Sequence, residues 1–211
     1  MKVTKFGHCC LLIEDEGLRI LTDPGSYSTA QNDVRDIDVI LITHEHVDHF
    51  HIPSLKNCLV NNPEARIITN KAVANLLDKE GIKYEIIEHD QEIEINGVLI
   101  EGFGDKHAQM YKTLTPVQNT GYFISNRLFY PGDALYNPNR PVDILALPVA
   151  GPWVKLSESI DYAIEINPKV AFPVHEGILK NPGSVHRIPN DILNPVGIKF
   201  IVLEEGKETE F

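Results

Sequence analysis

Residues 37–49 read IDVILITHEHVDH, an aliphatic run followed at once by three histidines and two acidic residues. The run is nearly continuous in β-branched and aliphatic side chains, which is typical of a strand buried on both faces. In the H-x-H-x-D-H pattern after it, His44 and His46 project from one side of an extended segment and can converge on one cation. Asp48 and His49, one turn further on, can reach a second cation. Neutral imidazole and carboxylate together suit zinc, and also iron, manganese or cobalt.

The alternative interpretation of this stretch is a solvated loop with scattered imidazoles. Against it, four of the nine histidines of the chain fall within eight residues, the fourth being His51. The cluster also follows a buried strand directly, which is where α/β folds place their sites. One cluster cannot close two metal sites, so further ligands are expected from other strand ends. Three residues fit because each follows a short apolar strand: His107, Asp133 and His175.

The composition is that of an ordinary globular protein. The chain has 211 residues, 43% hydrophobic and 23% charged, and no linker-like tract, which predicts one domain over residues 1–211. The formal net charge of -11, without a Lys/Arg cluster, opposes binding to a phosphate backbone, so we expect no nucleic-acid partner. No apolar run approaches the roughly 20 residues of a membrane span, and no signal-peptide pattern opens the chain. With three cysteines, an odd number, these features predict a cytoplasmic protein without membrane attachment.

The remaining sequence predicts an α/β domain with more strands than helices. Asn96-Gly97 is a strong hairpin signal, and Asn70 can cap the helix that follows it. We expect a loop around His186 and a frayed tail over residues 204–211. Helices are predicted over residues 53–60, 71–79 and 157–166, and strands over residues 3–6, 10–14, 19–22, 37–43, 66–69, 93–95, 98–100, 121–124, 128–130, 144–147, 170–173 and 199–203.

These motifs together resemble the metallo-β-lactamase superfamily. The resemblance rests on H-x-H-x-D-H, a later His107, Gly132-Asp133 after a strand, and Val174-His175 further on. The chain is similar in particular to the small stand-alone metal-dependent hydrolases of that superfamily, which include ascorbate-phosphate-lactonase-like and other cytosolic members. That group opens with a Gly-His pair, here Gly7-His8, and has a strand ending in Asp-Pro, here Asp23-Pro24. The resemblance implies an α/β fold, a four-layer αββα sandwich.

The ligand scheme of the family carries over residue by residue. The resemblance implies one metal held by His44, His46 and His107, a second held by Asp48, His49 and His175, and Asp133 as the bridge. Asp23 matches an aspartate that supports the metal loop without binding metal. The implied activity is hydrolysis, in which a hydroxide shared by two divalent ions attacks an ester, lactone, thioester or phosphoester of a small molecule. Zinc is the expected metal, with manganese or iron as alternatives, and Asp48 is the catalytic residue that takes or relays a proton.

Four further residues are candidates for support of the site or for substrate contact. His8 belongs to a position near the metal cavity in similar proteins, although a buried, hydrogen-bonded histidine is an equal alternative. His186 and Arg187 can contact substrate, since a guanidinium suits a carboxylate or phosphate, but an exposed loop explains them as well. Trp153, the only tryptophan, follows a buried strand and can form a cavity wall or plain core.

Other functional classes are compatible with the same motif. Di-iron proteins that reduce oxygen or nitric oxide usually have Glu at the position of His46 and carry a flavin domain. Nucleases and tRNA-processing enzymes add a domain or a basic arm to a similar core. A non-enzymatic metal- or ligand-binding protein on this fold usually lacks one or more ligands, whereas this chain has the full set. Because fold does not determine the substrate, the expected partner is a small molecule, and a homo-oligomer is compatible with the sequence.

Overall fold

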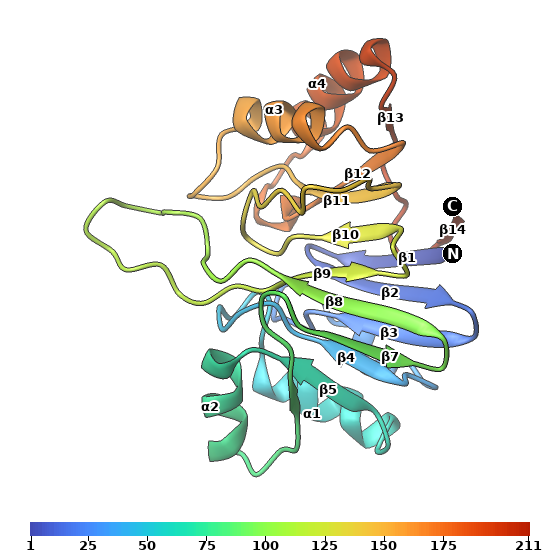
Figure 1. Ribbon diagram of the computed structural model, residues 1–211, viewed down its shortest axis with the longest axis vertical. Coiled ribbons are helices and arrows are strands. Elements are labelled where there is room, and N and C mark those ends of the chain that lie inside the picture. Colours follow the sequence, from blue (N-terminus) through green and yellow to red (C-terminus); the bar gives the residue numbers. More distant parts are fainter.

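The side chains of each central strand pack alternately into two different apolar layers. In β4 (Val39–Leu41), Val39 and Leu41 contribute to an inner core between two sheets, whereas Ile40 packs with helices on the outside. Because successive side chains of a strand point to opposite faces, a continuous aliphatic run places its strand between two such layers. The computed structural model, which describes residues 1–211, is accordingly a four-layer αββα sandwich, as predicted (Figure 1).

The first sheet has seven strands in the order β14-β1-β2-β3-β4-β5-β6. β1, β2 and β3 pair antiparallel, and β3 to β6 pair in parallel. β1, β3 and β4 therefore run in one direction, and their carboxyl ends lie at one edge of the sheet. Besides β4, the strands are β1 (Lys2–Gly7), β2 (Cys10–Asp15), β3 (Leu18–Thr22), β5 (Arg66–Thr69), β6 (Glu85–Ile86) and β14 (Glu208–Glu210).

The second sheet also has seven strands, in the order β13-β12-β11-β10-β9-β8-β7. β7 to β10 pair antiparallel and β10 to β13 pair in parallel. β8, β10, β11 and β12 consequently share one direction, and their carboxyl ends also meet at one edge. The strands are β7 (Glu92–Ile95), β8 (Val98–Phe103), β9 (Gly121–Ile124), β10 (Leu128–Tyr130), β11 (Ile144–Pro148), β12 (Val170–Val174) and β13 (Lys199–Phe200).

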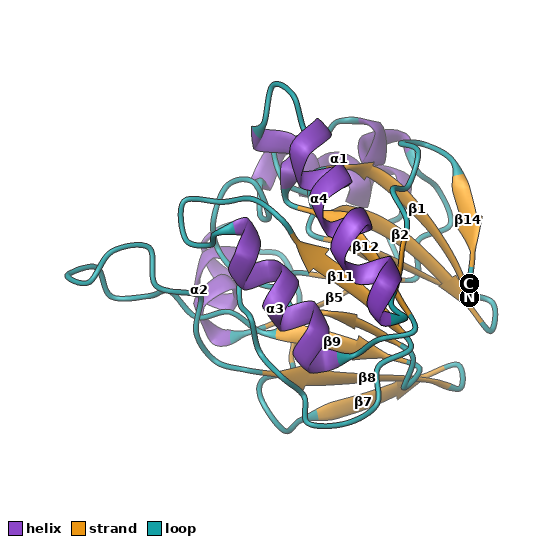
Figure 2. Cartoon of the chain, turned by 90° about the horizontal axis from the view of Figure 1, so that it is seen from above, coloured by secondary structure: helices purple, strands orange, loops and turns teal.

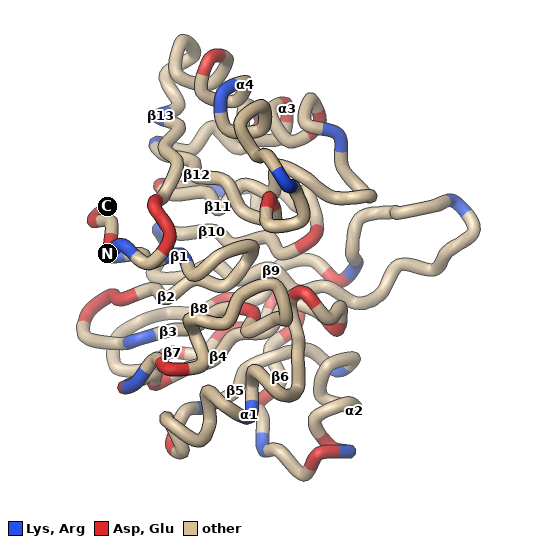
Figure 3. Tube along the Cα trace, turned by 180° about the vertical axis from the view of Figure 1, so that it is seen from behind, with Lys and Arg blue, Asp and Glu red and all other residues tan.

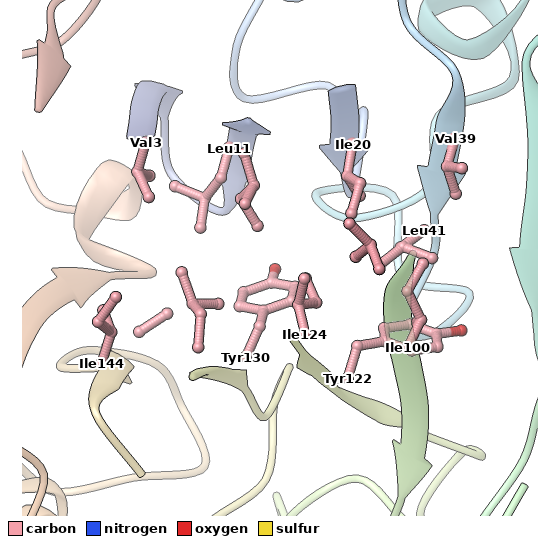
Figure 4. Close-up of a cluster of buried hydrophobic side chains, with 14 of the residues drawn as sticks. Val3, Leu11, Ile20, Val39, Leu41, Ile100, Tyr122, Ile124, Tyr130 and Ile144 are labelled. Carbon is pink, nitrogen blue, oxygen red and sulfur yellow. The ribbon is translucent and has the colours of Figure 1, made fainter. Parts of the chain in front are cut away.

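The inner core joins the two sheets. Figure 4 shows Val3, Leu11 and Ile20 of the first sheet directed toward Ile124 and Tyr130 of the second. All five side chains are completely or almost completely removed from solvent. Burial of apolar surface stabilises the fold by about 25 cal/mol per Å², so this layer fixes how the two sheets face each other.

Two helices cover the outer face of each sheet (Figures 1 and 2). On the first sheet, α1 (Ile52–Asn61) and α2 (Lys71–Lys79) pack through Leu55, Val73 and Leu77. On the second sheet, α3 (Leu156–Ile166) and α4 (Gly183–Leu193) provide the equivalent cover. Three short 3-10 turns complete the chain: η1 (Ala30–Asp33), η2 (Glu176–Ile178) and η3 (Asn194–Val196).

Elements with a local sequence signal lie where they were predicted. α2 covers the predicted residues 71–79, and the Asn70 side chain caps it by accepting from the amide of Val73 at 3.2 Å. The Asn96-Gly97 hairpin and β9 and β10 are also confirmed. The predicted strand over residues 37–43 is shorter, because only β4 (Val39–Leu41) pairs as a strand.

Two predictions for the last part of the chain are wrong. Residues 204–211 are not a frayed tail: β14 pairs antiparallel with β1, and Phe211 packs on Phe172 with ring centres 5.8 Å apart. The segment around His186 is not a loop but part of α4, which continues through an internal proline, Pro189. Both elements are stabilised by contacts with distant segments, which local patterns do not report.

The charged residues lie over the whole outer surface. Figure 3 shows Lys and Arg singly or in small groups along the chain, interspersed with Asp and Glu. None of the four α-helices combines the length and the apolar character needed to traverse a membrane.

Candidate metal centre

The loops that follow the co-directional strands bring the predicted ligand residues together at one end of the sandwich. His44, His46, His107 and Asp133 form one group, with ligand atoms all within 4.8 Å of one another. In this group His44 Nε2 lies 3.1 Å from His46 Nδ1. His107 Nε2 lies 3.2 Å from Asp133 Oδ2. These four residues come from the loops after β4, β8 and β10.

The other predicted ligands lie directly beside this group. His175 Nε2 is 3.5 Å, and His49 Nε2 is 3.8 Å, from Asp48 Oδ2. Asp133 reaches this set as well, with Oδ1 at 3.1 Å from His49 Nε2 and Oδ2 at 2.9 Å from His175 Nε2. The Cys9 sulfur is close to these nitrogens, but burial raises the pKa of its thiol to about 11, which disfavours the thiolate that metals bind.

Three donor atoms of the centre lack the hydrogen bonds that buried polar atoms normally make. His49 Nε2, His175 Nε2 and Asp133 Oδ1 are buried and have no hydrogen-bond partner, although they lie close to one another. Buried polar atoms are satisfied in the great majority of cases, so such a set calls for an explanation. Imidazole nitrogens and carboxylate oxygens directed at common points are the donor set of a divalent cation such as zinc, and these residues therefore fit bound metal.

Hydrogen bonds on the far side of the rings orient three of the histidines. His49 Nδ1 is 2.7 Å from Asp23 Oδ2, and His107 Nδ1 is 2.6 Å from the carbonyl of Ala108. His44 Nδ1 lies 3.0 Å from Thr43 Oγ1, which itself donates to Asp23. A ring that donates from Nδ1 presents the lone pair of Nε2, so each of these rings directs an acceptor nitrogen into the centre.

Asp23 binds both ends of the H-x-H-x-D-H loop through Thr43 and His49. It is completely buried, and its carboxylate accepts from the Thr43 amide at 2.8 Å and the Thr43 hydroxyl at 2.7 Å. The Tyr130 hydroxyl, from the second sheet, donates to Asp23 Oδ2 at 2.5 Å. The backbone at Gly25 lies close to the backbone of Asp48. A Cβ on residue 25 would lie 1.8 Å from the carbonyl oxygen of Asp48, so only glycine permits this close approach.

Electrostatics favour the ligand forms of three side chains. Burial holds the pKa of His44 well below its usual value, so this ring stays neutral. Burial opposes ionisation of Asp133, but the neighbouring His49, His107 and His175 outweigh it and hold the pKa of Asp133 well below its usual value. Burial opposes ionisation of Asp48 as well, yet the hydrogen bond with His8 lowers its pKa. Metals bind neutral imidazole and ionised carboxylate, so these three side chains are in the protonation states that metal binding requires.

His49 responds differently because it lies between carboxylates. Burial disfavours its protonation, but Asp133 and Asp23 raise the pKa of His49 well above its usual value. The negative charge around this ring favours a cation at Nε2, either a proton or, once that proton is released, a metal ion.

The residues predicted to support the site or contact substrate lie at different distances from the donor atoms. His8 is buried beside the centre, with Nε2 at 3.0 Å from Asp48 Oδ2 and its ring centre 4.2 Å from that of His175. His186, on α4, reaches Glu176 at 3.3 Å. The structure does not bring Arg187 to the centre, because its exposed side chain pairs with Asp191 on the same helix at 3.2 Å.

A cavity of about 370 Å³ opens onto the donor atoms. Trp153 lies in its wall, with its ring 5.6 Å from that of His107 and 5.8 Å from that of His175. The complete lining is Tyr27, His46, Val47, Asp48, His107, Met110, Asp133, Pro152, Trp153, His175 and Ile178. The sequence did not single out Tyr27, Val47 or Ile178, because a lone apolar residue in a loop has no periodicity to reveal it.

A buried ion pair behind the centre was also missed. Lys5 is almost fully buried and pairs with Glu176, the residue directly after His175. Lys5 also donates to the carbonyl of Pro173 at 2.9 Å. A lysine in an alternating strand pattern is normally assigned to solvent, so only its surroundings identify this contact.

Comparison with known proteins agrees with the fold and the motif. A family model described as a beta-lactamase superfamily domain matches residues 2–175. Protein Rv0786c of Mycobacterium tuberculosis is 34% identical over 184 residues, covering 85% of both chains. A UPF0173 metal-dependent hydrolase of Methanosphaera stadtmanae is 26% identical over 198 residues, covering 83% of both chains.

Among solved structures, a candidate metal-dependent hydrolase of Parabacteroides distasonis superposes with a TM-score of 0.78 at 25% identity. The match covers 96% of this chain and 92% of that one. The family match spans most of the chain and includes every donor residue of the centre. The chain belongs to the metallo-β-lactamase superfamily.

Proposed function

We propose that the protein is a metal-dependent hydrolase of small molecules that uses two divalent ions. One ion would be held by His44, His46 and His107, the other by Asp48, His49 and His175, with Asp133 shared between them. The names of relatives support the general activity, since several are metal-dependent hydrolases. The proposal describes a single metallo-β-lactamase-like domain over residues 1–211.

The placement of Asp133 carries the proposal. Its two oxygens lie within 3.2 Å of nitrogens of His49, His107 and His175, which belong to both donor sets. Its Oδ1 is buried and makes no hydrogen bond. A carboxylate between two donor sets is the arrangement expected of a bridging ligand.

The side chains of the centre have distinct tasks in hydrolysis. Two divalent ions at these positions would supply a water nucleophile near neutral pH and polarise the oxygen of the scissile bond. Asp48 faces the cavity and can accept the proton of the attacking water. His8, at 3.0 Å from Asp48 Oδ2, orients that carboxylate.

Metal content and hydrolysis should be measured on the same samples of wild type, Asp133→Asn and Asp161→Asn. Asp161 is exposed on α3 and serves as the matched control. We expect close to two metals per chain in wild type and in the control. In Asp133→Asn we expect a lower content, and hydrolysis reduced by about a hundredfold or more, at least the loss seen when an outer-shell partner is removed.

The substrate panel should contain ester, lactone, thioester and phosphodiester compounds. Metal binding with hydrolysis of one class supports the proposal and identifies the bond. Absence of bound metal after reconstitution would overturn the ligand assignment. Two irons with redox activity and no hydrolysis would instead favour oxygen chemistry on this fold.

A further inference from the structure

Exposed apolar side chains gather around the mouth of the metal cavity. Twelve large hydrophobic side chains of the chain are exposed, and four of them line this one cavity: Tyr27, Val47, Met110 and Ile178. Two more, Tyr111 and Leu114, lie on the same connection as Met110. Single exposed apolar residues need no explanation, but a contiguous group around a cavity marks a binding surface.

The group is assembled from segments that are distant in sequence. Tyr27 follows β3, Val47 lies among the ligand residues, and Ile178 ends η2. Met110 comes from the long connection between β8 and β9, which extends away from the sandwich in Figure 1. Because the loops converge on the donor atoms, the apolar wall and the reactive centre form one cavity. The Tyr27 ring, 5.0 Å from that of His8, links the two.

The wall carries no positive charge. No Lys or Arg lines the cavity, and its ionisable residues are all members of the donor set or the neighbouring tyrosine. Lys106, Lys112 and Lys180 are close in sequence to lining residues, but their side chains are exposed and do not line the cavity. Sites that hold a carboxylate or phosphate on the outer part of a substrate usually supply Arg or Lys for it. This cavity offers such a group no cationic side chain.

We propose that the substrate carries an uncharged apolar group, an acyl chain or aromatic ring of modest size, next to the bond that is cleaved. This inference rests on the proposed hydrolase function and specifies its substrate class. The carbonyl would face the donor residues, while the apolar group would contact Tyr27, Trp153 and Ile178. The volume of about 370 Å³ is at the small end of the range for small-molecule sites, which sets the size of that group.

The first test measures binding without catalysis. Trp153 is the only tryptophan and lines the cavity, so its fluorescence reports occupancy. The metal-loaded protein should be titrated with 2-butanone, 2-hexanone and 2-octanone, which are uncharged and cannot be hydrolysed. We expect Kd to fall about two- to fourfold per added methylene, as burial of each methylene predicts. The compound 5-hydroxy-2-pentanone, of equal length to 2-hexanone but ending in an uncharged hydroxyl, should bind at least tenfold more weakly than 2-hexanone.

Single substitutions test whether the dependence of Kd on chain length comes from the apolar wall. Ile178→Ala and Tyr27→Ala should flatten the dependence of Kd on chain length. Ile164→Ala is the matched control, because Ile164 on α3 is 42% exposed and Ile178 is 40% exposed. The same variants should lower kcat/KM for p-nitrophenyl hexanoate more than for p-nitrophenyl acetate, whereas the control should behave as wild type.

The outcomes separate this inference from the proposed function. If the protein hydrolyses a substrate but 5-hydroxy-2-pentanone binds as well as 2-hexanone, the apolar substrate class is wrong and the hydrolase remains. If no metal binds and no substrate is cleaved, the hydrolase proposal fails, whereas ketone binding still tests the wall. If Ile178→Ala alters sedimentation and the ketones show no dependence on length, a second copy of the chain covers this face and the inference is overturned.

Discussion

Asp23 connects three parts of the candidate site through one carboxylate. It binds Thr43 at the start of the ligand loop, His49 at its end, and Tyr130, which precedes Asp133 by three residues in the second sheet. All of these partners are donors. An acceptor-only carboxylate therefore satisfies the arrangement, and a neutral amide of the same shape cannot.

The substitution Asp23→Asn should lower the free energy of unfolding by about 2–4 kcal/mol, because it leaves buried donors without a charged acceptor. It should also weaken zinc binding by about ten- to a hundredfold, since His49 loses the partner that orients it. Urea unfolding and zinc titration measure the two effects. Tyr130→Phe is the control, because it removes one donor and should destabilise by only about 1 kcal/mol. Wild-type zinc affinity in Asp23→Asn would rule out a supporting role.

At the scale of elements, the turn after β12 depends on contacts with β1 and α4. His175 has a positive φ of 71°, a conformation that few non-glycine residues adopt, so the surrounding structure must hold it. The next residue, Glu176, provides such a contact because it pairs with Lys5 of β1 and with His186 of α4. A strand from the beginning of the chain thus stabilises the position of a candidate ligand near its end.

Removing the charge of Glu176 should therefore destabilise the protein. Glu176→Gln leaves the buried Lys5 ammonium without its counter-charge, and we expect a loss of about 3 kcal/mol in urea unfolding. The double variant Lys5→Met/Glu176→Leu should recover most of that loss, because apolar side chains of similar size can replace a buried pair. Glu80→Gln, which breaks the exposed pair with Lys56, is the control and should cost less than about 1 kcal/mol. Equal losses in both single variants would show that the buried pair has no special role.

At the scale of the whole molecule, several weakly acidic groups are buried in their neutral form. Burial, with a smaller contribution from Cys58, raises the pKa of Cys10 well above its usual value. Burial also raises the pKa of Cys58 to about 11. The buried hydroxyls of Tyr122, Tyr130 and Tyr162 have raised pKa values for the same reason. In the unfolded chain these groups ionise at their ordinary values.

Stability should consequently decrease at alkaline pH. Above pH of about 9 the unfolded chain has released the thiol protons that the folded chain retains, so the unfolded state is favoured as pH rises. We expect the free energy of unfolding to fall by about 1 kcal/mol per pH unit for each such thiol between pH 9 and 11. Urea unfolding across this range measures the slope. The variant Cys10→Ala/Cys58→Ala should have a shallower slope, and an unchanged slope would exclude these thiols as its cause.

The local signals in the sequence determined much of the molecule. The aliphatic run before His44, the Asn70 cap and the Asn96-Gly97 turn each act through neighbours within a few residues. Short apolar runs bounded by turn residues therefore located most strands, and the spacing of H-x-H-x-D-H located the start of the candidate centre. Positions at strand ends identified His107, Asp133 and His175 as candidate ligands, and the resemblance to the superfamily assigned each to a metal. The structure brings all three together with the motif.

Only the tertiary structure decided the features that depend on distant segments. β14 is a strand because β1, some 200 positions earlier in the chain, offers its edge. α4 forms despite Pro189 because Val185 and Leu193 pack against the second sheet. Lys5 can be buried because it forms an ion pair with Glu176. The apolar wall forms because Tyr27 and Ile178, from separate loops, line the same cavity. Hydrogen bonds and periodicity within a segment are determined by the residues of that segment. Pairing and burial between segments depend on how the whole chain folds.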